Sequence, residues 1–175
     1  MFRRYVPVVL LLGALSASAA EIPNQLIDYP AFQYQVGRVG ELRQLRRVTA
    51  EDFIRMAADP RTVVLDARSA EKFALMHVKG ARNLSLPDFT ADELAKIIPA
   101  KNTRVLIYCN NNFLNEPRAF PSKNIAVALN VHTFVSLNAY GYTNVYELGP
   151  LIDIGKSSIP FEGELAARRQ AALAP

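Results

Sequence analysis

The chain has 175 residues, of which 50% are hydrophobic and 21% are charged. This length and composition are typical of one globular domain with its own hydrophobic core and are marginal for two such domains. They exclude a collagen-like chain, a long disordered chain and a disulfide-rich scaffold, since the chain contains a single cysteine.

Residues 1–20 have the pattern of a secretory signal peptide. Two arginines precede an apolar run from Val6 to Leu15, and small residues follow. This order predicts cleavage after Ala19 or Ala20 and a periplasmic or secreted protein. The alternative is an uncleaved membrane anchor, for which the apolar run is too short to span a bilayer comfortably. We therefore expect no stable membrane span after removal of the signal.

The remaining chain holds 18 basic and 16 acidic residues, which gives a net charge of +2. Such a mild charge does not indicate a nucleic-acid partner, and the chain has no basic stripe with interleaved aromatic residues. We expect no interaction with nucleic acid.

Residues 21–47 mix prolines, glycines and isolated aromatic residues. We interpret this stretch as an extended N-terminal arm that packs on the domain, with at most a short helix over Glu41–Arg46. Regular structure is predicted from Val48 onward.

Helices and strands are predicted to alternate through the rest of the chain. Two capping boxes, beginning at Thr49 and Thr90, each predict a helix start. Another helix is expected over Ala70–Met76, and a long apolar one runs from Ser122 or Asn124 to Tyr140. The predicted strands are Thr62–Leu65, Ala81–Leu84, Arg104–Tyr108 and Asn144–Leu148.

This alternation predicts an α/β domain with a mainly parallel central sheet covered by helices on both faces, a three-layer α/β/α arrangement. Functional crevices in such sheets lie at the carboxyl ends of the strands. Asp66 and Cys109 each follow a predicted buried strand. We therefore expect both residues at one rim of the sheet.

Cys109 is the only cysteine, so it cannot form an internal disulfide or a dithiol pair. It is an inert buried thiol, an intermolecular partner or a reactive group. A metal cluster is not expected because the only histidines are His77 and His132, and we expect no cofactor. Loop N–H groups and a helix start beyond the thiol would lower its pKa and favour a thiolate.

Two motifs resemble the rhodanese-like domain family. The first, the more specific, comprises Asp66-Ala-Arg68-Ser69, Glu71, Phe73 and His77-Val-Lys-Gly80-Ala81-Arg-Asn83. The second comprises Tyr108-Cys109 and Gly141-Tyr-Thr-Asn-Val145-Tyr-Glu-Leu148-Gly149, and Ile159-Pro160-Phe161 is similar to the closing segment. The resemblance covers residues 48–161 and leaves 162–175 as a C-terminal tail in which we expect a frayed helix.

The resemblance implies a rhodanese-like fold and a sulfurtransferase in which Cys109 becomes a persulfide. The donor would be a small sulfur compound such as thiosulfate or a persulfide, and the acceptor a thiol or a protein. A terminal sulfur needs N–H donors around it, which the loop after Cys109 would provide.

The remaining candidate site residues lie around this loop. Substrate-binding or loop-organising roles are predicted for Asn110, Asn111, Asn112, Phe113 and Arg118. A supporting role is predicted for Asp66 and Arg68, as a pair that organises the loop.

The loop departs from the family pattern, because three asparagines replace its glycine-containing part and the loop extends to Pro121. A longer loop predicts a larger pocket or a different anion cradle. One alternative function is therefore a non-catalytic binding or sensing module. Another is a phosphatase or arsenate reductase, although Arg118 is poorly placed to clamp an oxyanion.

Overall fold

The computed structural model describes residue 22 and residues 24–173. The predicted signal peptide, residues 1–20, lies outside this part of the chain. Among the described residues, none of the helices combines the length and the hydropathy that crossing a membrane requires.

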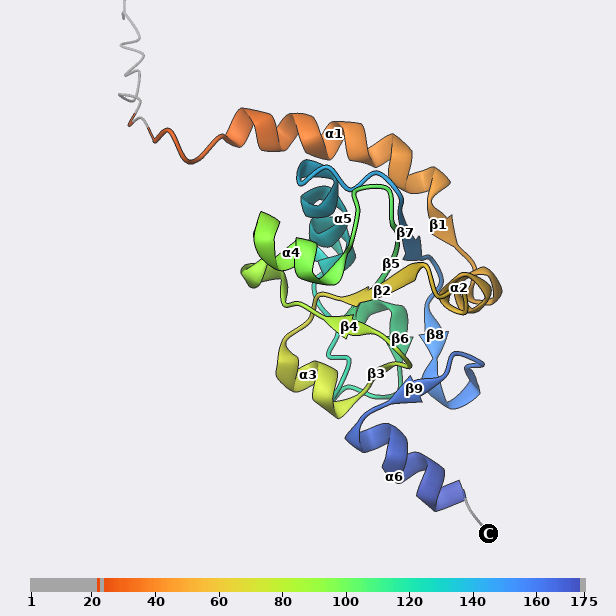
Figure 1. The fold of residues 1–175 in the computed structure, drawn as a ribbon. Coiled ribbons are helices and arrows are strands. Elements are labelled where there is room, and N and C mark those ends of the chain that lie inside the picture. Colours follow the sequence, from red (N-terminus) through yellow and green to blue (C-terminus); the bar gives the residue numbers. More distant parts are fainter. Residues whose placement is uncertain (1–21, 23, 174–175) are drawn as a thin grey trace, which may run out of the picture.

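The central sheet contains five parallel strands in the order β1-β7-β5-β2-β4 (Figure 1). Their bounds are β1 (Arg47–Val48), β2 (Thr62–Asp66), β4 (Arg82–Asn83), β5 (Arg104–Tyr108) and β7 (Val145–Leu148). Short strands form two further pairs, β3 (His77–Val78) with β9 (Phe161–Glu162) and β6 (Phe113–Leu114) with β8 (Ile152–Asp153). The predicted parallel sheet is confirmed.

The helices are α1 (Tyr29–Leu45), α2 (Ala50–Ala57), α3 (Ala70–Leu75), α4 (Ala91–Ile97), α5 (Leu129–Ala139) and α6 (Glu164–Leu173). The predicted caps are present: Thr49 and Thr90 accept hydrogen bonds from the main chain of Asp52 and Glu93. Such caps satisfy N–H groups that the first helical turn leaves free.

Alternate residues of β2 and β5 enter two separate cores. Val63 and Ile107 pack on one face of the sheet with residues of α1, α4 and α5. Val64 and Leu106 pack on the other face with residues of α2 and α6. This explains the continuous apolar runs, since a strand covered on both faces has no polar side, and it confirms the three layers.

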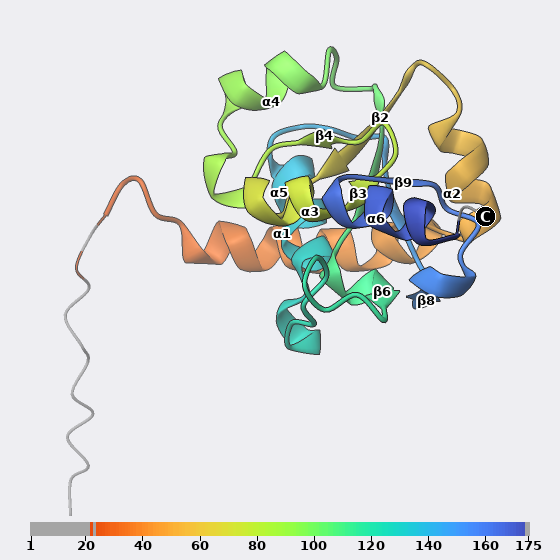
Figure 2. The same ribbon diagram turned by 90° about the horizontal axis from the view of Figure 1, so that it is seen from below.

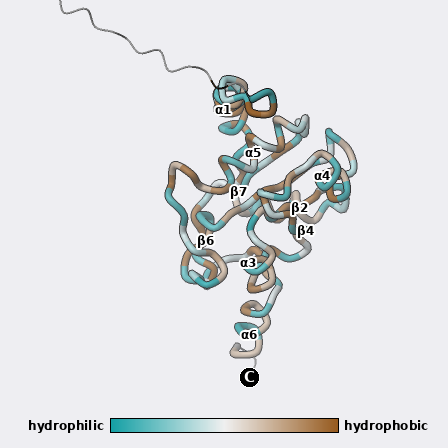
Figure 3. Tube along the Cα trace, turned by 90° about the vertical axis from the view of Figure 1, so that its left-hand side faces the viewer, coloured by the Kyte–Doolittle hydropathy of each residue, from teal (hydrophilic) through white to brown (hydrophobic). Residues whose placement is uncertain are grey.

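The N-terminal arm was predicted wrongly, because residues 29–45 form a helix and not an extended chain. Asp28 caps α1, and Pro30 occupies its first turn, where a proline costs no hydrogen bond. Val39 is buried against α5, and most of the other side chains of α1 are exposed. α1 and α6 lie at opposite ends of the molecule (Figures 1 and 3).

The long apolar helix was predicted to begin too early. Asn124 caps only a short 3-10 turn, Ile125–Val127, and α5 begins at Leu129. Ile125 and Val127 are exposed, so apolar character was a poor guide to the helix start. α5 is apolar on several sides because the sheet covers one side and α1 another.

The C-terminal tail is a helix, as expected, but part of it is docked. Leu165 and Ala166 of α6 are buried in the second core, and α6 packs on α3 and β9.

Candidate functional site

Cys109 and Asp66 lie at the same rim of the sheet, as predicted. β2 and β5 pair in register with Asp66 opposite Tyr108, and Cys109 follows directly. The parallel register therefore brings the two motifs together at the carboxyl ends of the strands.

Cys109 begins a tight turn, and residues 109–112 are called the thiol turn below. Asn110–Asn112 form a single 3-10 turn, and β6 follows at once and pairs with β8 (Figure 2). The first part of the extended loop is therefore a compact turn followed directly by a strand. Cys109 as a whole is only 2% exposed.

Main-chain N–H groups face the Cys109 sulfur from two directions. Burial raises the pKa of the Cys109 thiol, and the N–H groups of Asn130, Asn111 and Asn112 oppose that rise. Asn130 lies in the first turn of α5, so the helix start does face the thiol as predicted. The expected net decrease in pKa is nevertheless wrong, because burial outweighs the N–H donors.

The three consecutive asparagines have different surroundings. Asn110 is buried. The Asn111 side chain forms two 2.9 Å hydrogen bonds with the main chain of Lys123, a pair called the clasp below. Asn112 Oδ1 accepts from the main-chain N–H of Cys109 at 2.9 Å, and its Nδ2 donates to the carbonyl oxygen of Leu148 at 2.8 Å. Asn112 therefore ties the thiol turn to the end of β7.

Two of the residues predicted to bind substrate are placed elsewhere. Phe113 is 2% exposed and packs against the rings of Tyr108, Phe120 and Phe161, so it belongs to the core and not to a binding surface. Arg118 is exposed, and no hydrogen bond or ion pair joins it to the thiol turn within the described part of the chain.

Asp66 and Arg68 form a buried ion pair. Arg68 Nε donates to Asp66 Oδ1 at 2.9 Å, and Nη2 donates to Oδ2 at 2.5 Å. Arg68 also donates to the carbonyl oxygens of Met76 and Ala119, each at 2.8 Å. The pair therefore anchors the segment that follows the thiol turn.

Tyr108 is part of the same hydrogen-bond network. Its hydroxyl donates to Asp66 Oδ2 at 2.5 Å and accepts from the main chain of Val78 at 3.1 Å. Burial raises the pKa of Tyr108 well above its ordinary value, so the hydroxyl stays protonated and remains a donor.

Sequence reasoning missed two further residues near the thiol. Glu147 is 1% exposed and pairs with Arg43 at 2.6 Å and Arg47 at 3.1 Å; its charge raises the pKa of Cys109. Asn130 donates from Nδ2 to Asn112 Oδ1 at 3.1 Å. A lone acid within a buried strand was a usable signal for Glu147, whereas nothing in the sequence distinguished Asn130.

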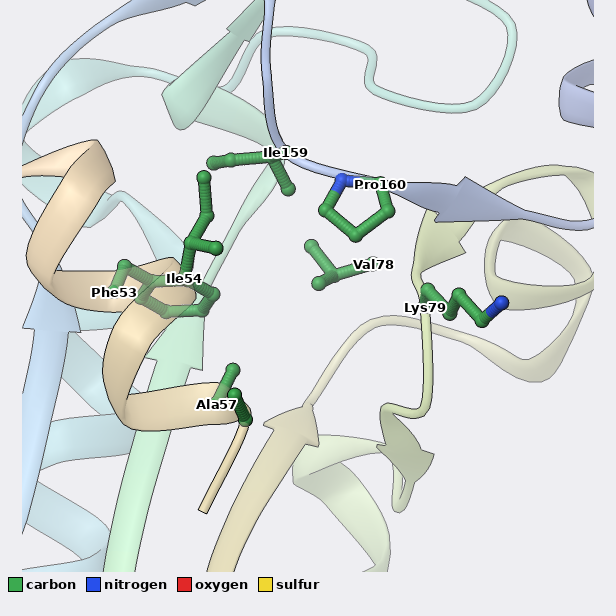
Figure 4. A pocket seen from close by; sticks show the side chains of 8 residues that line it. Phe53, Ile54, Ala57, Val78, Lys79, Ile159 and Pro160 are labelled. Atoms are coloured by element: carbon green, nitrogen blue, oxygen red, sulfur yellow. The ribbon is translucent and has the colours of Figure 1, made fainter.

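A mostly apolar cavity lies away from the thiol. A cavity of about 230 Å³ lies between α2 and the residues Val78, Ile159 and Pro160 (Figure 4). Cys109 does not line it, so this cavity is separate from the candidate site.

We expect the clasp to restrict access to the thiol, because it holds the segment before α5 against the thiol turn. Asn111→Ala removes both bonds and should increase the rate of Cys109 alkylation by iodoacetamide roughly tenfold. Asn138→Ala, on the far end of α5, is the matched control. Equal alkylation rates in Asn111→Ala, the control and wild type would contradict a gating role.

The fold and the thiol at the end of β5 define an α/β domain with a cysteine at its functional rim. The family model described as Rhodanese-like domain matches residues 49–148. The chain therefore belongs to the rhodanese-like domain family.

Two solved structures show the same fold at low sequence identity. The rhodanese-like domain of the Alr3790 protein from Anabaena sp. is 18% identical with a TM-score of 0.50, over 70% of this chain and 83% of that one. The BH2092 protein from Bacillus halodurans is 18% identical with a TM-score of 0.50, over 83% and 99%. A thiosulfate sulfurtransferase from Pseudomonas aeruginosa is 18% identical with a TM-score of 0.45, over 82% and 27%. No curated protein matches the chain.

Proposed function

We propose that this protein is an exported sulfurtransferase that carries sulfane sulfur on Cys109. The observation that supports this most directly is the set of three main-chain N–H groups facing the sulfur of the single cysteine, at the functional rim of a rhodanese-like domain. Such donors stabilise negative charge on sulfur during transfer. Export rests on the signal-peptide pattern of residues 1–20.

The reaction has two steps. The Cys109 thiol loses its proton, and the thiolate attacks the outer sulfur of a small donor. The sulfur–sulfur bond of the donor breaks, and its inner fragment leaves with the bonding electron pair. An acceptor thiolate then attacks the terminal sulfur of the Cys109 persulfide and releases the Cys109 thiolate.

A mass spectrum of the intact protein tests this function. After incubation with thiosulfate or with glutathione persulfide, wild type should gain one sulfur atom from at least one donor, and Cys109→Ser should gain none. If wild type gains no sulfur from either donor, sulfur transfer is refuted.

The proposed export is tested separately by the mass of the protein recovered from the periplasmic fraction. Protein that still contains residues 1–20 in that fraction would count against a cleaved signal peptide.

One observation favours a second candidate, a binding module without catalysis. Cys109 is only 2% exposed, and burial raises the pKa of its thiol, so the thiol is covered and held in its protonated form at neutral pH. A partner that binds with equal affinity to wild type and Cys109→Ser, together with no sulfur uptake, would support this candidate.

A further inference from the structure

The cavity of about 230 Å³ beside α2, called the α2 cavity below, lies apart from the rim that carries Cys109. Its walls come from α2, from Val78 and Lys79, and from the segment just before β9 (Figure 4). Two of its lining residues, Ala58 and Lys79, are exposed, so a small molecule can reach it without unfolding of the core. An apolar cavity of about 150 Å³ is already large enough to bind benzene.

The side chains around the α2 cavity are almost entirely apolar. Phe53 and Ile54 of α2 face Ile159 across it. Among the described residues that line the cavity, Lys79 alone has a polar side chain. That side chain is 65% exposed and lies near the carboxylate of Glu162, and Figure 4 shows its amine pointing away from the other lining residues.

The main-chain N–H groups at the wall are already bonded within the protein. Val78 donates to the hydroxyl of Tyr108 at 3.1 Å. Lys79 donates to the carbonyl oxygen of Pro160 at 2.9 Å. A charged ligand would therefore lose its water on entering the cavity without gaining hydrogen-bond partners there, which is costly.

The space exists because α2 ends in small side chains. Ala57 and Ala58 both line the cavity, and a larger side chain at either position would fill part of it. An empty apolar cavity lowers stability, because the atoms of its walls lose dispersion contacts. A molecule that fills the cavity restores those contacts.

We propose that the α2 cavity is a binding site for a small, uncharged, mainly apolar molecule, of about the size of one aromatic ring with a short carbon chain. This inference does not depend on sulfur transfer, because Cys109 does not line the cavity.

A molecule in the α2 cavity would contact two of the residues that hold Tyr108. The ring of Phe53 lies edge-on to the ring of Tyr108, with the ring centroids 6.5 Å apart, and Val78 donates to the Tyr108 hydroxyl. Tyr108 directly precedes Cys109. The α2 cavity and the candidate site therefore share one buried side chain between them.

The test is a titration of the full protein with ethylbenzene, followed by the NMR signals of methyl groups. The ring current of a bound aromatic molecule should shift the methyl signals of Ile54, Val78 and Ile159, which line the cavity. The methyl signals of Val63 and Val105 should stay in place, because these residues belong to the core on the other face of the sheet. No shift at the solubility limit of ethylbenzene, or equal shifts in both groups, would overturn the inference.

A second titration with phenylacetate tests the chemical class of the ligand. Phenylacetate has a similar size but carries a carboxylate, so it should bind at least about tenfold more weakly than ethylbenzene. Equal or tighter binding of phenylacetate would overturn the assignment to uncharged molecules.

Two cavity-filling variants and one control locate the binding site. Ala57→Phe should abolish the shifts caused by ethylbenzene, because the new ring occupies the cavity. Ala58→Phe, at an exposed lining position, gives the same test if Ala57→Phe does not fold. Ala95→Phe places the same ring on the exposed side of α4 and should bind ethylbenzene like wild type. Unchanged binding in a folded cavity-filling variant would overturn the assignment of the site.

Discussion

Arg68→Met should lower the free energy of unfolding by about 3–5 kcal/mol, because it leaves the carboxylate of Asp66 buried without its partner. Both members of the pair are almost fully buried, with side chains 1% and 0% exposed. The substitution also removes the donor from the carbonyl oxygens of Met76 and Ala119. Urea unfolding at neutral pH measures the change.

Two further variants test whether the loss of stability comes from the buried ion pair. Arg55→Met removes an exposed pair with Asp52 and should unfold at the same urea concentration as wild type, because exposed pairs contribute little. Asp66→Asn combined with Arg68→Met should recover part of the loss, since it removes the unpaired charge. If Arg68→Met unfolds like Arg55→Met, the pair does not anchor the fold.

Glu147→Gln should lower the pKa of Cys109. The carboxylate raises that pKa now, and its removal leaves two arginines nearby that favour a thiolate. The rate of iodoacetamide alkylation, followed against pH, should therefore reach its half-maximum at a lower pH. The change should also weaken folding, because a buried group loses its ion pairs.

Glu162→Gln is the control for this experiment, since Glu162 pairs with His77 and Lys79 and not with groups near the thiol. An unchanged or higher pH midpoint of alkylation in Glu147→Gln would contradict the assigned role of Glu147.

The raised pKa of Cys109 also determines the direction in which the free energy of unfolding changes with pH. The folded state holds the Cys109 proton more tightly than the unfolded chain, so stability falls as the pH rises above the ordinary thiol value.

The sheet could be predicted because its strands carry their own signals. The apolar runs before Asp66 and Cys109 end at polar residues, and the helices between them begin at Thr49 and Thr90 with caps. These features are local in sequence, so they were enough to predict the order of helices and strands. They also predicted that Asp66 and Cys109 lie at the same rim of the sheet.

The interior of the site could not be predicted in the same way. Phe113 follows three asparagines in what reads as a polar loop, yet β6 pairs with β8 and places its ring in the core. The pKa of Cys109 depends on burial and on Glu147, which lies 38 positions further along the chain. Only the tertiary structure buries Cys109 and brings Glu147 near it.

The helical nature of residues 29–45 was missed for a related reason. The segment contains two glycines and a proline, which lower intrinsic helix propensity. Docking of Val39 and Leu42 against α5 supplies the missing stabilisation, as tertiary packing often does for helices.

The ion pairs of Glu147 give the N-terminal segment an influence over the thiol. Arg43 belongs to α1 and Arg47 to β1, both ahead of the residues that the family model matches. A protease cut behind residue 47 would remove both cations at once and leave the carboxylate unopposed beside the sulfur. The truncated protein would keep Cys109, but the thiol would be less reactive because the charge of Glu147 would no longer be offset. The residues ahead of the family match therefore help to set the pKa of the thiol through Arg43 and Arg47.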